Sequence, residues 1–310
     1  MIIKRVFFII FLLFLSSLKN SYAYENKIIL KIDNEIITQL DIFNEVHYLK
    51  ALNPSIKKLE KEKINLIGKN SLIREKIKQK EILKYVKEIK IDQKYLNKLI
   101  KSRYYRLNLN SKKEFLDYLK QYNIDLDTIE KKITIEALWN EIIFAKFSAK
   151  LKINEEMLRN EIQENKKFKL KSYLLSEILF TLSSKNQLND KYKTIKEEIL
   201  INGFENAALE YSDSDSARIG GKLGWIREDA LNKIIKKELS SLKVKSITNP
   251  IFTPNGYLVL KIEDIKFLEK EYDIEKELKK LVEFKTNQQL NQFSNFYYNK
   301  VKKDVTINEL

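Results

Sequence analysis

Apolar residues recur every three or four positions over most of the chain between residues 38 and 168, a spacing typical of amphipathic helices. Thr38 with Asp41, and Ser111 with Glu114, have the spacing of capping boxes at helix starts, and Asn154 is a further N-cap candidate. Because an amphipathic helix cannot bury its apolar stripe alone, these helices are expected to pack against one another. Helices are predicted after Thr38 and at about 57–66, 71–89, 92–103, 112–122, 126–149 and 155–164.

Short strands are predicted at both ends of the chain. Residues 27–32 and 36–37 have the pattern of two strands joined by a turn at 33–35, and a long helix over 269–302 is followed by a strand at 304–307. A single strand has to pair to satisfy its backbone hydrogen bonds. The first and last strands are therefore expected to pair, so that the two ends of the chain form one domain.

The segment 169–265 has a different pattern, because five of the six glycines and two of the three prolines lie between 203 and 256. Gly220 and Gly221 permit a positive φ at the entry to a strand, and Gly224 allows another backbone or a ligand to approach closely. Four strands with helices between them indicate an inserted α+β unit. The strands are expected at 169–181, 223–225, 250–253 and 257–262, and the helices at 190–202, 204–211 and 229–238.

The predicted fold class is therefore α+β. A mainly helical N-terminal arm is completed by a C-terminal helix and strand, and it carries an inserted module that has a four-stranded sheet with flanking helices. The predicted boundaries are 1–23 for an export signal, 24–168 for the arm, 169–265 for the module, and 266–310 for the C-terminal helix and strand that pack back on the arm.

The first 23 residues have the features of a secretory signal peptide. Lys4 and Arg5 precede an unbroken apolar run over residues 6–15, and Ser21 and Ala23 are the small residues that signal peptidase requires. The apolar run is shorter than the roughly 20 residues needed to span a bilayer. We expect cleavage after Ala23, export to the periplasm and no stable membrane span afterwards; an uncleaved membrane tether is the alternative.

Composition excludes several kinds of chemistry. The chain has no Cys and one His, His47, so disulfides, thiol nucleophiles, Cys-ligated metals and His-pair metal sites are impossible, and no cofactor or metal is expected. The formal net charge is +15, but only seven of the 58 basic residues are Arg. Nucleic-acid recognition favours Arg forks and basic–aromatic patches, so a nucleic-acid partner is not expected. The basic excess lies mainly in the arm, and the module is nearly neutral.

One ordered motif connects the module to a known family. The run from Ser212 to Trp225 has the pattern S-D-S-D-S-A-x-x-G-G-x-L-G-W, and the run from Pro250 to Tyr257 has the pattern P-I-F-T-x-x-G-Y. Both resemble stretches of parvulin-type peptidyl-prolyl isomerases (rotamases). With the export signal, the helical arm and the returning C-terminal helix and strand, the whole chain resembles periplasmic chaperones of the SurA type that carry one parvulin domain.

The resemblance implies a peptide groove with two His residues, a Cys or Asp, and an apolar proline pocket. Here the two His positions fall on Glu177 and Leu258, so the imidazole pair is missing. The Cys/Asp position falls on Ser214 or, with a one-residue shift, on Asp213 or Asp215. The pocket keeps its apolar character in the residues that match it: Leu223, Leu231, Ile235, Phe252 and, at its edge, Thr253.

Glu177 has two interpretations. It either replaces a His as a hydrogen-bond acceptor in the groove or is a solvated strand residue, and we favour the second because a carboxylate without a partner in the sequence is usually solvated.

The resemblance implies an ATP-independent periplasmic chaperone that binds unfolded outer-membrane proteins. The arm and the C-terminal segment are expected to carry most of the client binding, and the module is expected to bind extended peptide with weak or absent isomerase activity. Two alternatives stay open. One is an active peptidyl-prolyl isomerase that uses Asp and Glu in place of His, and the other is a membrane-tethered peptide-binding protein.

Overall fold

The computed structural model describes residues 26–164, 170–268 and 273–310. The predicted signal peptide, residues 1–23, and its cleavage site therefore lie outside the described residues. None of the helices in the described ranges is long and apolar enough to cross a membrane.

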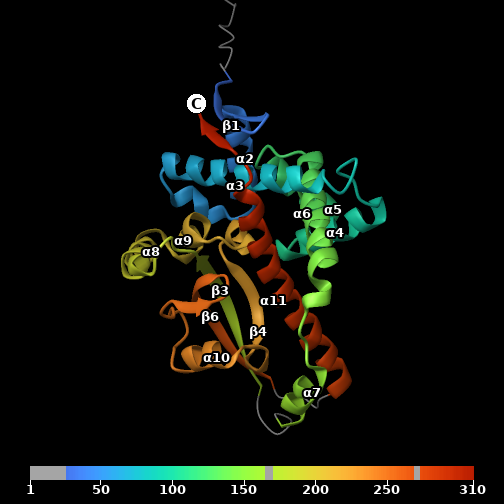
Figure 1. Cartoon of the computed structure of the whole chain (residues 1–310), viewed down its shortest axis with the longest axis vertical. Coiled ribbons are helices and arrows are strands. Elements are labelled where there is room, and N and C mark those ends of the chain that lie inside the picture. The colour runs from blue at the N-terminus through green and yellow to red at the C-terminus, as the bar shows by residue number, and fades with distance from the viewer. Residues whose placement is uncertain (1–25, 165–169, 269–272) are drawn as a thin grey trace, which may run out of the picture.

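The two ends of the chain meet in a three-stranded sheet. Strand β1 (Ile28–Ile32) lies between β2 (Glu35–Thr38) and β7 (Ile307–Glu309), and both pairings are antiparallel. The predicted pairing of first and last strands is confirmed (Figure 1). The last strand begins later than predicted, because the backbone N–H groups of Lys303 and Asp304 still donate to carbonyls of the preceding helix.

The arm is built from helices joined by short turns. These are α2 (Gln39–Leu52), α3 (Lys61–Ile82), α4 (Gln93–Arg106), α5 (Lys112–Lys120), α6 (Leu126–Phe147) and α7 (Glu155–Glu164), with 3₁₀ turns η1 (Pro54–Lys58) and η2 (Ser148–Lys150). The capping box of Thr38 and Asp41 starts α2 as predicted, and Ser111 and Asn154 accept the expected cap hydrogen bonds from Glu114 and Met157.

One helix prediction is wrong. The segments 57–66 and 71–89 were expected to be separate helices, but α3 runs unbroken through Gly68 and ends at Ile82. A Cβ atom at Gly68 would lie 2.9 Å from Cγ2 of Val46, so this glycine is the point where α2 and α3 cross closely. The absence of a side chain serves helix packing here rather than helix termination.

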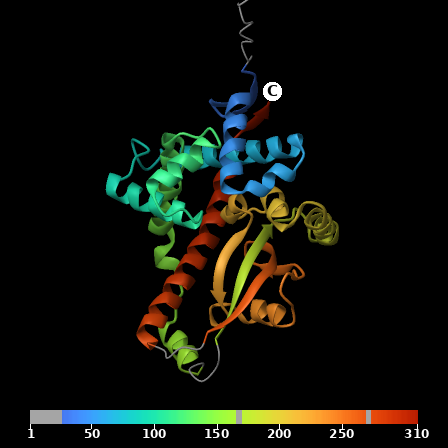
Figure 2. The ribbon, with the colours of Figure 1, turned by 180° about the vertical axis from the view of Figure 1, so that it is seen from behind.

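The last helix connects both parts of the molecule. Helix α11 (Ile274–Lys302) begins beside α7, runs along the module and ends at the three-stranded sheet (Figures 1 and 2). Near its start, Leu278 and Leu281 join the module's core, and near its end, Tyr297 and Val301 join a cluster around Trp139 of α6. Trp139 is fully buried, and its Nε1 donates to Ser294 Oγ at 2.8 Å. The C-terminal segment thus completes the arm, as predicted.

The module has the predicted four-stranded sheet with helices around it. Its elements are β3 (Leu170–Phe180), η4 (Lys185–Gln187), α8 (Leu188–Asn202), α9 (Phe204–Tyr211), η5 (Asp215–Ile219), β4 (Lys222–Arg227), η6 (Glu228–Ala230), α10 (Lys233–Ser240), β5 (Ile251–Thr253) and β6 (Gly256–Leu268). The strand order is β4-β3-β6-β5, and all neighbours are antiparallel. Helices α8 and α9 pack on one face, and α10 packs on the other. The predicted fold class is confirmed.

Three boundaries of the module differ from expectation. Helix α10 begins at Lys233 rather than at 229, because η6 comes first and Asn232 Oδ1 caps the helix by accepting from Ile235 N at 2.8 Å. Strand β6 continues to Leu268, past the predicted end of the strand at 262 and past the predicted module limit at 265. Helix α7, assigned to the arm, places Leu158 and Ile162 in the module's core cluster. The domain limits themselves stay predictions.

Ion pairs join the module to the arm. Asp215 of η5 pairs with Lys78 Nζ at 3.0 Å and with Arg74 Nε at 3.2 Å, both on α3. Arg218 of η5 pairs with Glu136 of α6 at 3.1 Å. Farther along the same boundary, Lys63 of α3 pairs with Glu198 and Glu210, at 2.5 and 2.6 Å. The loop between α9 and β4, residues 212–221, carries most of the sequence motif, and we call it the motif loop. It is therefore part of the contact between the arm and the module.

The loop is also held by a close backbone contact at Gly221. Its φ is +76°, and a Cβ atom there would lie 2.2 Å from the carbonyl oxygen of Glu177. Gly224 was expected to be the point of close approach, but no described atom lies within 4 Å of a Cβ placed there. Its φ of +84° is the reason for glycine at this position.

We therefore expect Gly221→Ala to be far more destabilising than Gly224→Ala. The second variant meets only the cost of a left-handed backbone, about 1–2 kcal/mol. The first adds a steric clash with a strand backbone, for a total of about 2–5 kcal/mol. Urea denaturation followed by circular dichroism measures both, and equal losses in the two variants would contradict the steric argument.

Candidate functional site

Some of the predicted groove residues lie on the face of the module's sheet that α10 covers. Leu231, Ile235 and Leu258 belong to one core cluster and are 9%, 5% and 9% exposed. Thr253 lies two residues after Ile251 on β5 and so shares its side of the sheet, where it is half-buried, and Leu223 of β4 is 38% exposed. Two of the five predicted pocket residues, Leu231 and Ile235, therefore form a closed apolar floor with Leu258, which occupies a His-equivalent position, while Leu223 and Thr253 remain accessible.

Phe252 does not share this face. It pairs with Tyr257 across the β5–β6 hairpin, whereas its neighbour Ile251 pairs with Leu258. Because side chains alternate along a strand, Phe252 points to the opposite side of the sheet from Leu258. Its ring meets that of Tyr257 edge to face at 5.6 Å, and the side chain is 68% exposed. The structure thus separates Phe252 from Leu231 and Ile235.

Glu177 is held by two hydroxyl groups. Its Oε1 accepts from Ser214 Oγ at 2.6 Å and from Ser216 Oγ at 2.9 Å. Burial of this half-buried side chain raises the pKa of the Glu177 carboxyl above its ordinary value. The interpretation as a solvated strand residue is wrong, because β3 and the motif loop enclose the carboxyl group. Ser216 belongs to the motif but was not predicted as a site residue, because the spacing of the motif does not show which way its hydroxyl group points.

The three candidates for the Cys/Asp position have different surroundings. Ser214 is the one that bonds Glu177. Asp213 accepts from the backbone N–H and the hydroxyl of Thr181, both at 2.9 Å, which fixes the end of β3. Burial acts to raise the pKa of Asp215, but the positive charges of Lys78 and Arg74 hold that pKa well below its ordinary value. Asp215 therefore forms ion pairs with the arm and does not bond Glu177.

His47 lies far from this constellation in the fold, on α2 of the arm. Its ring is 4.3 Å from that of Phe43, and burial lowers the pKa of its imidazole. In the described ranges, no group of three or more His, Asp or Glu residues is placed to hold a metal ion. The polar groups of the groove are thus the carboxyl group of Glu177 and the hydroxyl groups of Ser214 and Ser216. These groups can form hydrogen bonds with a peptide amide.

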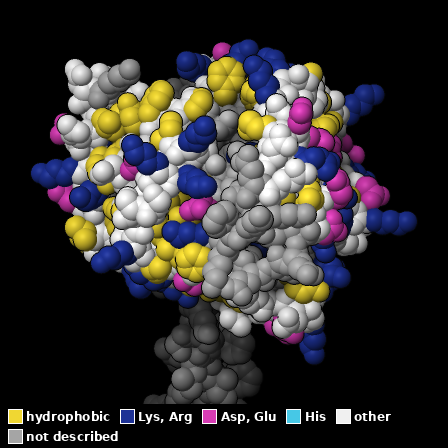
Figure 3. Space-filling view, turned by 90° about the horizontal axis from the view of Figure 1, so that it is seen from below, with side chains coloured by type: hydrophobic (Ala, Val, Ile, Leu, Met, Phe, Trp, Pro, Cys, Tyr) yellow, Lys and Arg dark blue, Asp and Glu magenta, His cyan; other side chains and the backbone are white. Residues whose placement is uncertain are grey.

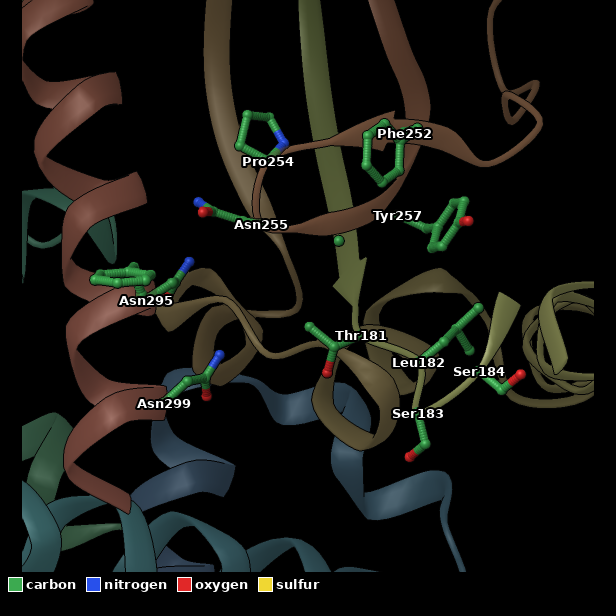
Figure 4. Close-up of a pocket in the computed structure, with 12 residues that line it drawn as sticks. Thr181, Leu182, Ser183, Ser184, Phe252, Pro254, Asn255, Tyr257, Asn295 and Asn299 are labelled. Atoms are coloured by element: carbon green, nitrogen blue, oxygen red, sulfur yellow. The ribbon is translucent and has the colours of Figure 1, made fainter. Parts of the chain in front are cut away.

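A hollow of about 360 Å³ lies between the β5–β6 hairpin and α11. Figure 4 shows Phe252 and Tyr257 on the hairpin side and Asn295 and Asn299 on α11, with Pro254 and Asn255 at the turn between them. Its lining combines exposed aromatic rings with side-chain amides. Such a lining suits an extended peptide, because amides pair with backbone groups while rings cover apolar side chains.

A second hollow, larger than the first, lies on the arm between β1, α2 and α3 and has a volume of about 730 Å³. Three large apolar side chains in its lining are exposed: Leu40 at 51%, Phe43 at 55% and Leu66 at 46%. We call this surface the arm hollow. The helical periodicity predicted that the apolar stripes pack against one another, and it did not single out the residues that stay exposed here. Lys61, Glu62 and Lys69 form part of its polar rim.

Charge is mixed on the visible surface. On the described part of the face shown in Figure 3, basic side chains are spread among acidic and hydrophobic ones and form no continuous basic field.

Comparison with known proteins places the module in a family. Residues 173–264 match the rotamase family model, the PPIC-type PPIase domain. The chain is 25% identical over 160 residues to the chaperone SurA of Pseudomonas putida, covering 49% of this chain and 38% of that protein. It is 29% identical over 279 residues to the chaperone SurA of Buchnera aphidicola subsp. Schizaphis graminum, covering 82% of this chain and 62% of that protein.

The chain spans less than two thirds of the length of these curated relatives. Among solved structures, one of two SurA-like chaperones from Campylobacter jejuni is 18% identical, with 92% of this chain and 99% of that chain covered and a TM-score of 0.36. The resemblance found in the motif is confirmed: the module is of the PPIC type, and the chain is similar to SurA chaperones.

The raised pKa of Glu177 gives a pH-dependent prediction. The folded protein holds this proton more tightly than the unfolded chain does, so the group's contribution to stability falls as the pH rises above the ordinary glutamate pKa of about 4.3. Glu177→Gln removes this loss and still accepts from both serines. We expect the variant to melt higher than the parent at pH 8, with the difference shrinking towards pH 4.5.

Glu263→Gln is the matched control with the opposite sign. Burial acts to raise the pKa of Glu263, but the ammonium groups of Lys261 and Lys245 bring it below its ordinary value, so its charge stabilises the fold at neutral pH. This variant should melt lower than the parent at pH 8. A Glu177→Gln variant that behaves in the same way would contradict the described environment of Glu177.

Proposed function

We propose that this protein is an exported, ATP-independent chaperone that binds unfolded polypeptides in the periplasm, with outer-membrane proteins as clients. The observation that carries the proposal is the arm hollow, where three large apolar side chains stay exposed in a concavity of about 730 Å³. The similarity to curated SurA chaperones over most of the chain supports it. Export follows from the predicted signal peptide at 1–23.

The arm hollow suits a client without a fixed sequence. Apolar side chains of an unfolded chain would cover Leu40, Phe43 and Leu66, and burial of this surface supplies a non-directional driving force. Strands β2 and β7 form the edges of the three-stranded sheet, so each also offers unpaired backbone groups to an extended segment. Neither interaction needs a particular client residue, which is the property a general holding chaperone requires.

The module would bind extended peptide with weak or absent isomerase activity. Rotation about an X–Pro bond has a barrier of about 18–20 kcal/mol, and a catalyst must favour the twisted amide over either planar form. The positions of the imidazole pair hold Glu177 and Leu258, and Leu258 is closed into the core beside Leu231. The remaining carboxyl and hydroxyls offer little preference for the twisted amide.

An active isomerase is the second candidate. The match to the PPIC-type family favours it, and so does the position of Glu177 between Ser214 and Ser216, which could polarise the prolyl amide in place of imidazole.

The arm hollow predicts where client binding is lost. We expect the double variant Leu40→Ser/Leu66→Ser to suppress the aggregation of an unfolded outer-membrane protein several-fold less well than the parent, because the apolar contact is removed. The control is Leu200→Ser/Ile201→Ser on α8, where the two side chains are 81% and 77% exposed outside the hollow. Light scattering measures suppression, and circular dichroism confirms folding. Unchanged suppression in the first variant, or an equal loss in the control, would contradict the proposal.

A prolyl tetrapeptide assay separates the two candidates for the module. We expect turnover close to the uncatalysed rate, with Ser214→Ala making no further difference. Turnover far above that rate, which then falls in Ser214→Ala, would establish the active isomerase instead. Ser214 is chosen because it contacts Glu177 from a loop and is not part of the apolar core.

A further inference from the structure

A separate cavity of about 240 Å³ lies where the arm, η5 and α11 meet. It adjoins the groove around Glu177 through Ser216, and it shares no lining residue with the hollow in Figure 4 or with the arm hollow. Four cationic side chains line it against two carboxylates, so its charged lining carries two more positive than negative charges. The charged residues are Lys78, Arg103, Arg106, Arg218, Glu136 and Asp215.

The two carboxylates do not satisfy all of these donors. Glu136 is divided between Arg103, at 2.8 Å, and Nη1 of Arg218, at 3.1 Å. The second terminal nitrogen of Arg218, Nη2, is buried and has no hydrogen-bond partner. A buried N–H without an acceptor is costly, and one such group in a native structure points to an absent acceptor.

Arg106 adds a second available guanidinium group. It lies at the end of α4, is exposed, and makes no ion pair within the described part of the chain. Arg106 belongs to the arm and Arg218 to the module. An acceptor held by both would therefore join the two parts of the molecule.

An apolar recess adjoins the cationic cavity. A second depression of about 190 Å³ shares Arg103, Arg106, Glu136 and Asn140 with the first, so the two are continuous. Beyond these shared residues its lining is mainly apolar or aromatic, made by Tyr95, Leu99, Ile133 and Ala137, with Ser102 as the one further polar residue. The combined site thus places a positive region directly beside an apolar one.

We propose that this site binds a carboxylate with an apolar side chain next to it, supplied by an unfolded polypeptide. A guanidinium group matches a carboxylate in geometry, and the two lining carboxylates disfavour a more highly charged anion. The apolar recess takes the neighbouring side chain. The polypeptide source rests on the proposed chaperone function, whereas the carboxylate chemistry rests on the cavity alone.

Calorimetric titration of the full mature chain tests the chemistry with three small phenylalanine derivatives and with inorganic phosphate. N-acetylphenylalanine carries a terminal carboxylate beside its ring, N-acetyl-aspartyl-phenylalaninamide carries a side-chain carboxylate, and N-acetylphenylalaninamide is neutral. We expect at least one acid to bind tenfold or more tightly than the neutral amide, and the better acid identifies the source as a chain end or an acidic side chain. Equal binding of all three probes, or tighter binding of inorganic phosphate than of either acid, would overturn the proposal.

Two variants locate the binding. Arg106→Met should weaken binding of the preferred acid about tenfold while leaving the melting temperature unchanged, because Arg106 makes no ion pair to lose. Lys98→Met removes the same charge from an exposed position on the same helix outside the cavity and should bind like the parent. Unchanged binding in Arg106→Met, or an equal loss in Lys98→Met, would refute the site. The variant Leu40→Ser/Leu66→Ser separates this site from the proposed chaperone function. If it no longer suppresses aggregation but still binds the acid, the carboxylate site does not depend on the arm hollow.

Discussion

The buried ammonium group of Lys78 is the constraint on which the arrangement of arm and module depends. The Lys78 side chain is 4% exposed, lies over the ring of Trp139, and pairs with Asp215 of the module at 3.0 Å. Burial lowers the pKa of Lys78, which reflects the cost of holding a charge there. Such a charge needs a fixed partner, because removing the partner leaves it unpaired in the interior. The module's loop supplies that partner and is thereby fixed against α3.

Because of this constraint, the motif loop makes two different contacts, one with Glu177 and one with the arm. Ser214 and Ser216 turn inward and bond Glu177, while Asp215, between them in sequence, turns outward to the arm. Gly221 then brings the loop against the backbone of β3, where Glu177 N donates to Gly221 O at 2.8 Å. The groove and the contact between the two parts are consequently built from the same residues. A change that moves the loop against the arm would also move the hydroxyls that hold Glu177.

The long C-terminal helix gives the rest of the molecule its continuity. Helix α11 contributes to the core of the module at Leu278 and to the Trp139 cluster at Tyr297, so neither part has a complete core without it. The pairing of β1 with β7 then fixes its far end. Ion pairs and α11 hold the arm and the module together. These contacts do not bury Leu40, Phe43 or Leu66, so the arm hollow stays exposed.

The element types, the α+β class, the inserted four-stranded module and the pairing of the chain ends could all be predicted from the amino-acid sequence, because periodicity, caps and motif order are local signals. The sequence also showed that no imidazole pair could exist in the groove, since composition does not depend on folding. Three features depend on the folded chain and could not be predicted: Gly68 is a helix crossing point, Phe252 faces away from Leu231, and Glu177 is enclosed. Folding alone brings Arg106 and Arg218 to one cavity. The physical reason is that these properties depend on which distant segments surround a side chain, and burial and charge pairing between distant segments leave no periodic trace in the sequence.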